Sequence, residues 1–243
     1  MGRQPRQLFP GAFYHVMSRG NDKQKIFLTN GDRRVFIKGL AGTIRDFRWN
    51  CHAYCLMGNH YHILIETPEA NLSEGMQQLN GNYCRYFAWK HKRIGHVVQG
   101  RFLSPLVENE RHLFALFRYI FLNPVKEGMA GSPENWRWSS YSATAGLCIE
   151  PDFLTTSFVL GCFSDNPSRA REEFTGYVLA GLHEASSMKD QALILNSLLK
   201  GTKDAGARND VIRSAIRDRG FSVAGVAGHL GVHPATIYRA LKD

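Results

Sequence analysis

The sequence predicts an α+β fold in which an antiparallel sheet carries helices on one face. Residues 60–66 alternate between two sets of side chains, which is the period of a strand with one face in a core. Residues 110–123 place apolar side chains at helical spacing, and shorter periodic stretches surround both segments. Their order, β-α-β-β-α-β-α, indicates a ferredoxin-like layout with the strand of residues 60–66 at its centre.

Four strands and three helices account for the elements expected between residues 13 and 123. The strands are expected at residues 13–18, 49–57, 60–66 and 102–107, and the helices at residues 32–46, 71–92 and 110–123. Gly58 and Asn59 form the turn of a hairpin between the second and third strands. Asn71 caps the second helix. Pro124 limits the third helix, because the residue before a proline is steered away from helical geometry.

Two histidines stand on one face of the predicted central strand. Side chains in a strand alternate between faces, so His60 and His62 point the same way, about 7 Å apart along the chain. Tyr61, Ile63 and Ile65 point the other way, into the core. Two neighbouring imidazoles on a rigid strand can bind a divalent metal ion. Coincidence is the more frequent origin of such a pair, so a metal site requires a further group from another element.

The helix of residues 110–123 supplies such a group. Tyr119 and Asn123 are four residues apart, so they share one face near the end of the helix. The phenol is a candidate nucleophile, and the amide oxygen is a candidate ligand. The alternative is a tyrosine at the edge of the core that merely keeps its hydroxyl in water.

Five motifs resemble the single-tyrosine HUH transposases, specifically the REP-associated kind. They occur in the order of that family and cover roughly residues 8–147 without gaps. The motifs are Tyr14–Asn21, His60–His62, Gln99–Phe102, Tyr119–Lys126 and Trp136–Tyr141. The chain departs from the better-known insertion-sequence relatives at Asn123, where they carry a glutamine.

The resemblance implies an enzyme that cleaves and rejoins single-stranded DNA. Tyr119 would attack a phosphodiester and form a 5′-phosphotyrosine intermediate. His60, His62 and Asn123 would hold Mg²⁺ or Mn²⁺, which would polarise the scissile phosphate. The implied substrate is the short imperfect hairpin of a repetitive extragenic palindrome, flanked by a recognition tetranucleotide. A homodimer is compatible with this interpretation, and the oligomeric state stays open.

The distribution of charge favours a nucleic-acid partner over a merely solvated basic face. The chain has a formal net charge of +9, and residues 1–147 contain 19 Lys and Arg against 10 Asp and Glu. Residues 75–107 contain no acidic residue, and their basic residues are interleaved with aromatic ones. The residues expected to contact DNA in this half are Arg19, Asn21, Arg85, Lys90, Lys92, Arg93, Arg101, Lys126 and Arg137.

Three regions are expected along the chain. Residues 1–147 form the nuclease domain that resembles the HUH transposases. Residues 148–206 form a helical extension and linker, and residues 207–243 form a separate helix-turn-helix domain. The C-terminal domain would complete an architecture in which an all-α region follows the sheet.

The helix-turn-helix prediction depends on three positions. Ala227 allows close approach of two helices, Gly231 makes the turn, and Ile237 packs the second helix. The alternative is a helical hairpin that binds protein. The second helix would contact duplex DNA through Thr236, Tyr238 and Arg239.

Composition favours a cytoplasmic protein, and the resemblance implies a bacterial one that is associated with the nucleoid. The five cysteines are odd in number and scattered, which is typical of reduced thiols rather than of a disulfide scaffold. Residues 1–10 lack the apolar core of a secretion signal, and no run of 18 apolar residues indicates a membrane span. We therefore expect no membrane partner.

Two other functions fit parts of the sequence. Cys51, Cys55, His60 and His62 have the spacing C-x3-C-x4-H-x-H, which is compatible with a structural zinc site in a DNA-binding regulator. A continuous strand would separate the two thiols by about 13 Å, too far for one ion. The other alternative is a descendant that binds DNA without cleaving it, and the triplet of His60, His62 and Tyr119 argues against it.

Overall fold

The computed structural model describes residues 8–182 and part of the C-terminal region. The described C-terminal residues are 209, 212, 213, 216, 223–230, 232, 236, 237, 240 and 241. The chain divides into an N-terminal unit, residues 1–179, and a C-terminal unit, residues 180–243. Within the described residues, no helix is both long and apolar enough to cross a membrane.

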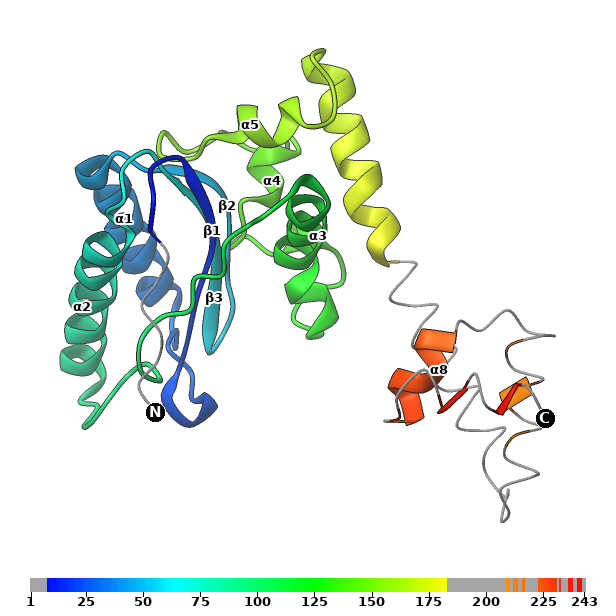
Figure 1. The fold of residues 1–243 in the computed structure, drawn as a ribbon. Helices are drawn as coiled ribbons and strands as arrows, with labels where there is room; N and C mark the ends of the chain where they lie inside the picture. The colour runs from blue at the N-terminus through cyan, green and yellow to red at the C-terminus, as the bar shows by residue number, and fades with distance from the viewer. Residues whose placement is uncertain are drawn as a thin grey trace. The chain divides into compact units, whose positions relative to one another are not determined.

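A three-stranded antiparallel sheet lies at the centre of the N-terminal unit (Figure 1). The strands β1 (Ala12–Arg19), β3 (His60–Thr67) and β2 (Asn50–Leu56) lie side by side in that order. The strand that carries the two histidines is therefore central, as predicted. The short 3-10 helix η1 (Asn21–Lys23) follows β1 directly.

Residues 102–107, predicted as a fourth strand, follow the other edge of β1 without forming a regular strand. Met17 and Leu103 exchange two backbone hydrogen bonds of 2.8 and 2.9 Å, and the amide of His15 donates to the carbonyl of Pro105 at 3.0 Å. Pro105 has no N–H to return the bond, so the pairing is limited to isolated bridges. The segment still brings residues 99–103 to the end of the sheet that carries the histidines.

Two helices cover one face of the sheet, as predicted. The helices α1 (Asn30–Phe47) and α2 (Leu72–His91) lie on the face that carries Tyr61, Ile63 and Ile65 (Figure 1). Their apolar side chains recur every three to four residues and meet those of the strands in one core. The buried residues at this interface include Phe36, Leu40, Ile44, Met76, Leu79, Tyr83 and Phe87.

The helix α3 (Glu110–Lys126) crosses the opposite face of the sheet (Figure 1). The expectation that this helix ends before Pro124 is wrong, because it continues to Lys126 with Pro124 inside. A proline in the last turn removes only one hydrogen bond. The amides of Glu127 and Met129 close that turn on the carbonyls of Asn123 and Pro124, at 3.0 and 2.8 Å.

The extension that follows α3 packs against it. The elements η2 (Pro133–Asn135), α4 (Tyr141–Thr144), α5 (Thr156–Gly161) and a helix over residues 167–182 come in that order. The ring of Phe114 contacts Phe163 and Tyr177, and the ring of Phe121 contacts Phe174. These contacts explain why the N-terminal unit extends to Leu179, past the boundary expected at residue 147.

The C-terminal unit contains the helix α8 (Val223–Leu230) and a small apolar core. That core is formed by Ile212, Val226, Ala227 and Ile237. Ala227 and Ile237 are thus buried where the helix-turn-helix prediction needs them, and Thr236 is exposed. The turn itself stays a prediction, because Gly231, Tyr238 and Arg239 lie outside the described residues.

Candidate active site

The predicted nucleophile lies against the predicted metal-binding pair. The rings of His60 and His62 have their centroids 4.9 Å apart on the face of β3 that α3 crosses. The ring of Tyr119 meets His62 edge to face, with centroids 5.0 Å apart. Two segments about sixty residues apart in sequence therefore meet where the alternation of β3 and the helical spacing of α3 predicted.

A third histidine orients one of the two, His62. His15 of β1 places its Nε2 atom 3.0 Å from Nδ1 of His62, within hydrogen-bonding distance. Its ring also contacts Tyr119, with centroids 5.8 Å apart. A partner on one imidazole nitrogen fixes the ring and leaves the other nitrogen to a ligand. We call His15, His60, His62, Tyr119 and Asn123 the histidine cluster.

The tautomer of His60 follows from its neighbour. Asn59 donates its side-chain N–H to the carbonyl of Lys23 at 2.9 Å, so its Oδ1 atom is the one that faces His60. That oxygen lies 2.7 Å from Nδ1 of His60 and can only accept, so Nδ1 carries the proton. The Nε2 atom of His60 is left with its lone pair, the form that ligates metals.

The histidine cluster contains polar atoms without a hydrogen-bonding partner. Among the residues that the structure describes, Nε2 of His62 and Oδ1 of Asn123 are buried and unsatisfied. Asn123 lies beside His60, close enough to oppose the lowering of its pKa. Buried polar atoms are nearly always paired in folded proteins, so unpaired ones indicate an absent ligand. The lone pairs of two imidazoles and an amide oxygen are a donor set that fits a divalent metal ion.

The histidines are neutral at physiological pH. Burial, with the neighbouring His15 and His60, lowers the pKa of His62 to about 2. Burial, with His112 nearby, lowers the pKa of His15 to about 4. Burial also lowers the pKa of His60. Neutral imidazoles bind a metal ion without having to release a proton first.

The histidine cluster opens into a cleft of about 560 Å³. Tyr119 is 42% exposed there, so its hydroxyl is accessible from solvent. Arg19 and Arg101, both predicted to contact DNA, line the same cleft from β1 and from the segment beside it. The remaining lining residues are Met17, Ser18, His60, His62, Gln99, Leu103 and Glu127.

Glu127 is a residue of this cleft that the sequence analysis missed. Its Oε1 atom lies 3.9 Å from Nε2 of His60. It follows Asn123 by four residues and Tyr119 by eight and is the C-cap residue of α3, so it continues the face that those two residues share. The signal was present in the sequence, but a helix ending before Pro124 would have left Glu127 outside that face.

The other predicted DNA contacts are spread over the surface of the N-terminal unit. Arg85, Lys92, Lys126 and Arg137 are exposed, and Asn21 and Arg93 are partly exposed. Arg137 lies over the ring of Trp138, 5.0 Å from its centroid. None of these side chains lines the cleft, so any role in binding DNA would lie beyond it.

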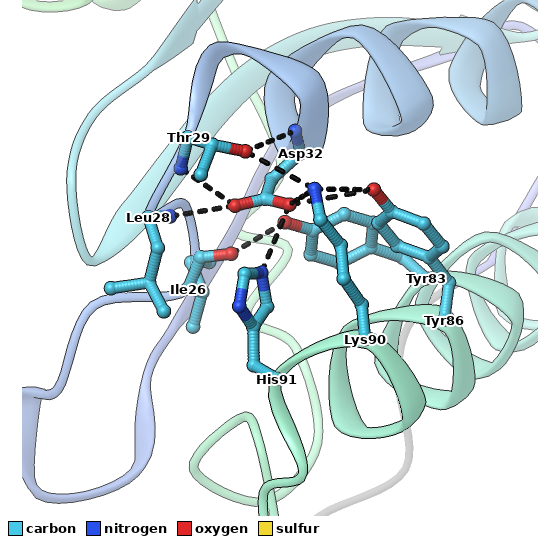
Figure 2. Close-up of polar contacts among 8 residues, drawn as sticks. All are labelled: Ile26, Leu28, Thr29, Asp32, Tyr83, Tyr86, Lys90 and His91. Atoms are coloured by element: carbon cyan, nitrogen blue, oxygen red, sulfur yellow. Dashed lines mark hydrogen bonds and ion pairs between the residues drawn. The ribbon is translucent and has the colours of Figure 1, made fainter.

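Lys90, also predicted to contact DNA, has a partner within the chain. Its Nζ atom lies 2.7 Å from Oδ1 of Asp32, a fully buried carboxylate that also accepts from His91 and from the amides of Leu28 and Thr29 (Figure 2). Burial would raise the pKa of Asp32, but hydrogen bonds from Lys90, His91 and Thr29 outweigh it and hold that pKa well below its usual range. We call Thr29, Asp32, Tyr86, Lys90 and His91 the Asp32 cluster.

Most aromatic residues of the basic segment are also structural. Tyr83 and Phe87 are buried between α1 and α2, and Tyr86 is partly buried beside Lys90. Trp89 alone among these four stays in solvent, with 81% of its surface exposed. Only Trp89 is therefore placed to stack on an unpaired base.

The structure argues against the zinc site. A register shift in β2 between Cys51 and Ala53 places Cys51 opposite Ile65 and Cys55 opposite His62. Cys51 therefore enters the core with α1 and α2, while Cys55 lies on the histidine face. Within residues 8–182 and the described C-terminal positions, no group of three His, Cys, Asp or Glu residues is placed to hold a metal ion. The sequence spacing alone could not reveal this shift.

Comparison with known proteins agrees with the predicted resemblance. Residues 10–121 match the family described as "Transposase IS200 like". A protein of Haemophilus influenzae named as a REP-associated tyrosine transposase is 25% identical over 164 residues, which cover 63% of this chain and 92% of that protein. The resemblance predicted from five motifs is thus confirmed at the level of sequence.

The fold also has a counterpart among solved structures. A REP-associated tyrosine transposase, solved bound to a REP hairpin, superposes with a TM-score of 0.52 at 18% identity. The match covers 64% of this chain and 92% of that chain. The mixed α/β architecture, with its small antiparallel sheet and flanking helices, is therefore shared with that protein.

Proposed function

Because residues 10–121 match the IS200-like transposases and the chain resembles a REP-associated tyrosine transposase, we propose that this protein cleaves and rejoins single-stranded DNA with Tyr119 as its nucleophile. The observation that carries the proposal is the placement of Tyr119. An accessible phenol lies 5.0 Å, ring to ring, from a buried histidine whose Nε2 atom has no partner. Nucleophile and phosphate-polarising group would thus act on the same bond.

The reaction exchanges one phosphodiester for another. The oxygen of Tyr119 forms a bond to phosphorus as its proton leaves, and the bond from phosphorus to the 3′ oxygen breaks. That oxygen takes up a proton and becomes a free 3′-hydroxyl, while the 5′ phosphate stays on the tyrosine. The step is nearly neutral in energy and needs no ATP. A second 3′-hydroxyl can attack the phosphotyrosine and rejoin the strands.

His60, His62 and Asn123 would hold a divalent ion, Mg²⁺ or Mn²⁺. When bound, the ion would act as a Lewis acid on the scissile phosphate. His15 would keep the ring of His62 in place through their 3.0 Å contact. Arg19 and Arg101 would bind phosphates of the strand on either side of the reacting bond, because guanidinium groups match phosphate geometry.

The proposed substrate is a single-stranded hairpin of the repetitive extragenic palindrome type. The solved counterpart is a complex with a REP hairpin. The net positive charge of residues 1–147 supports a nucleic-acid strand as substrate. Duplex DNA bound through the C-terminal unit, a homodimer and a place in the bacterial nucleoid are further parts of the proposal that await their own tests.

The direct test is a covalent adduct. We expect the wild-type protein, incubated with Mn²⁺ and labelled hairpin DNA, to form a species that survives denaturation. Tyr119→Phe should abolish that species and leave DNA affinity within about twofold, because only the nucleophilic oxygen is removed. Tyr61 and Tyr141 are each 1% exposed and cannot substitute for it. An adduct that persists in Tyr119→Phe would refute the assignment.

A further inference from the structure

One tryptophan stands apart from the other three of the chain. Trp89 lies on the outer face of α2 with 81% of its surface exposed. Trp49 and Trp138 are only 3% and 6% exposed, and Trp136 is partly buried with its indole N–H bonded to the carbonyl of Leu56 at 3.0 Å. The exposed indole therefore contributes little to the core, and its neighbours decide what it can bind.

The surroundings of Trp89 are basic. Arg85 lies one turn earlier on the same helix face, and Lys92, the C-cap residue, follows Trp89 by three residues. Both side chains are exposed, and Arg85 donates to the neutral side chain of Asn82 at 2.6 Å, a bond that does not neutralise its charge. Residues 75–107 contain no acidic residue. We call Arg85, Trp89 and Lys92 the α2 stripe.

A short segment connects the α2 stripe to the cleft. Residues 93–98 run from the end of α2 to the end of β1, where the carbonyl of Val97 accepts a backbone hydrogen bond of 3.1 Å from η1 (Figure 1). The amide of Gln99 then donates to the carbonyl of Arg19 at 2.8 Å, and both of these residues line the cleft. Seven residues of chain span at most about 25 Å, so Lys92 lies within that distance of Gln99. A strand that leaves the cleft beside Gln99 can therefore reach the stripe.

We propose that the α2 stripe is a second binding site for single-stranded DNA, which holds the strand that flanks the hairpin after it leaves the cleft. The inference rests on the proposed function. Trp89 stacks on an unpaired base, and Arg85 and Lys92 bind phosphates on either side of that base. The carboxylate at this end of α2, Asp32, is fully buried and paired with Lys90, so it does not repel a phosphate. A base-paired strand offers no free face to the indole, so the site selects unpaired DNA.

The test compares two labelled probes by fluorescence anisotropy, with full-length protein in the Tyr119→Phe background that leaves DNA intact. One probe is the hairpin alone, and the other carries an oligothymidine tail of about 16 nucleotides at each end, enough to cover about 25 Å at the duplex rise. The tailed probe should bind at least tenfold more tightly. Trp89→Ala should lose about tenfold for the tailed probe, the effect of one stacked base, and less than twofold for the hairpin. Trp89→Phe should keep the gain.

Two controls sharpen this comparison. Ile149→Ala removes another apolar side chain that is 94% exposed, and it should leave the affinity for both probes unchanged. Iodide should quench mainly the fluorescence of Trp89, because the other tryptophans are shielded. The unlabelled tailed probe should protect Trp89 from iodide, and the hairpin alone should not.

The outcomes separate this inference from the function it rests on. Equal losses for both probes in Trp89→Ala, or no loss for either, would overturn the second site and leave the proposed function standing. An equal gain from double-stranded tails would also overturn it. Protection of Trp89 by anionic phospholipid vesicles and not by the tailed probe would assign the stripe to a membrane surface instead. A wild-type protein that binds neither probe would overturn the proposed function as well.

Discussion

Two polar clusters lie on opposite faces of one sheet, and they differ in whether their buried polar atoms have hydrogen-bonding partners. In the Asp32 cluster, the buried carboxylate accepts hydrogen bonds from two backbone amides at 2.9 and 2.7 Å and from the side chains of Lys90 and His91 at 2.7 and 3.1 Å (Figure 2). In the histidine cluster, Nε2 of His62 and Oδ1 of Asn123 are buried without any partner. The first is satisfied within the chain, and the second is not.

The difference indicates what each cluster is for. A satisfied network joins the start of α1 to the end of α2 and contributes stability, because each group has lost water and gained a partner. Unsatisfied groups lower stability, and two of the four buried unpaired side-chain atoms in the described part of the chain lie in the histidine cluster, the others being Nε of Arg33 and Oγ1 of Thr67. The Asp32 cluster is thus part of the scaffold, whereas the unpaired atoms of the histidine cluster are those that the proposed function assigns to a metal ion.

The largest effect should come from the histidine cluster. His62→Ala and His60→Ala should each lower cleavage by about a thousandfold, as the loss of a charge-stabilising group does at other sites. Metal dependence should disappear with the activity. His15→Ala should have a smaller effect, about ten- to a hundredfold, because His15 acts only by orienting His62. Single-turnover cleavage of a labelled hairpin measures both.

The larger loss of cleavage in His62→Ala than in His15→Ala is what distinguishes a ligand from a residue that orients it. Equal losses in His15→Ala and His62→Ala would show that the two histidines have equivalent roles. Elemental analysis provides a further control. One zinc ion tightly held per chain, in protein purified without added metal, would favour a structural metal instead.

Substitutions in the Asp32 cluster should change the free energy of unfolding and not the chemistry of cleavage. Asp32→Asn leaves Lys90 and His91 without their charged partner and should lower the free energy of unfolding by about 3 kcal/mol. Asp46→Asn is the matched control, since the side chain of Asp46 is 44% exposed, pairs with an arginine that is 81% exposed and accepts a hydrogen bond from Gln78 at 3.1 Å. That control should change the free energy by less than about 0.5 kcal/mol. Denaturant unfolding measures both.

The stability that Asp32 contributes should also depend on pH, in a direction that its pKa determines. Because the pKa of Asp32 is held below its usual range, its contribution to stability is complete above about pH 4 and is lost as the pH falls further. The difference between the wild type and Asp32→Asn should therefore stay constant above about pH 4 and shrink as the pH falls toward about 2. A difference that grows with acidity would contradict the role of the buried carboxylate.

The smallest effect is expected from the C-terminal unit. All net positive charge lies in residues 1–147, so deletion of residues 207–243 should leave cleavage of a short hairpin within about tenfold, or about 1.4 kcal/mol. Selection among longer targets that contain duplex DNA should weaken more. A truncated protein that folds but no longer cleaves the short hairpin would show that this region belongs to the active site.

Local sequence patterns predicted the parts of the structure that local rules determine. The alternation of β3 placed His60 and His62 on one face, and the spacing of α3 placed Tyr119 with Asn123. Glu127 was missed because a proline was taken as the end of the helix, whereas the last turn tolerates one. The four-residue spacing predicted the shared face correctly, whereas the predicted end of the helix was wrong.

Non-local contacts determined what sequence patterns could not. Lys90 was assigned to DNA from its basic neighbourhood, but its partner Asp32 lies 58 residues earlier in the chain. The register shift beside Cys51 separated two thiols that a regular strand would have kept on one face. Both depend on how distant elements meet, which composition and spacing do not encode.

The most direct test of the contrast between the two clusters is the stability of Asn123→Leu, measured by denaturant unfolding with and without Mn²⁺. Leucine has a similar volume and no polar atom to leave unpaired. We predict that the variant is more stable than the wild type by about 1 kcal/mol without metal, and that Mn²⁺ stabilises only the wild type. A variant that is less stable than the wild type without metal, together with no stabilisation of the wild type by Mn²⁺, would contradict the view that Asn123 is held unpaired for a ligand.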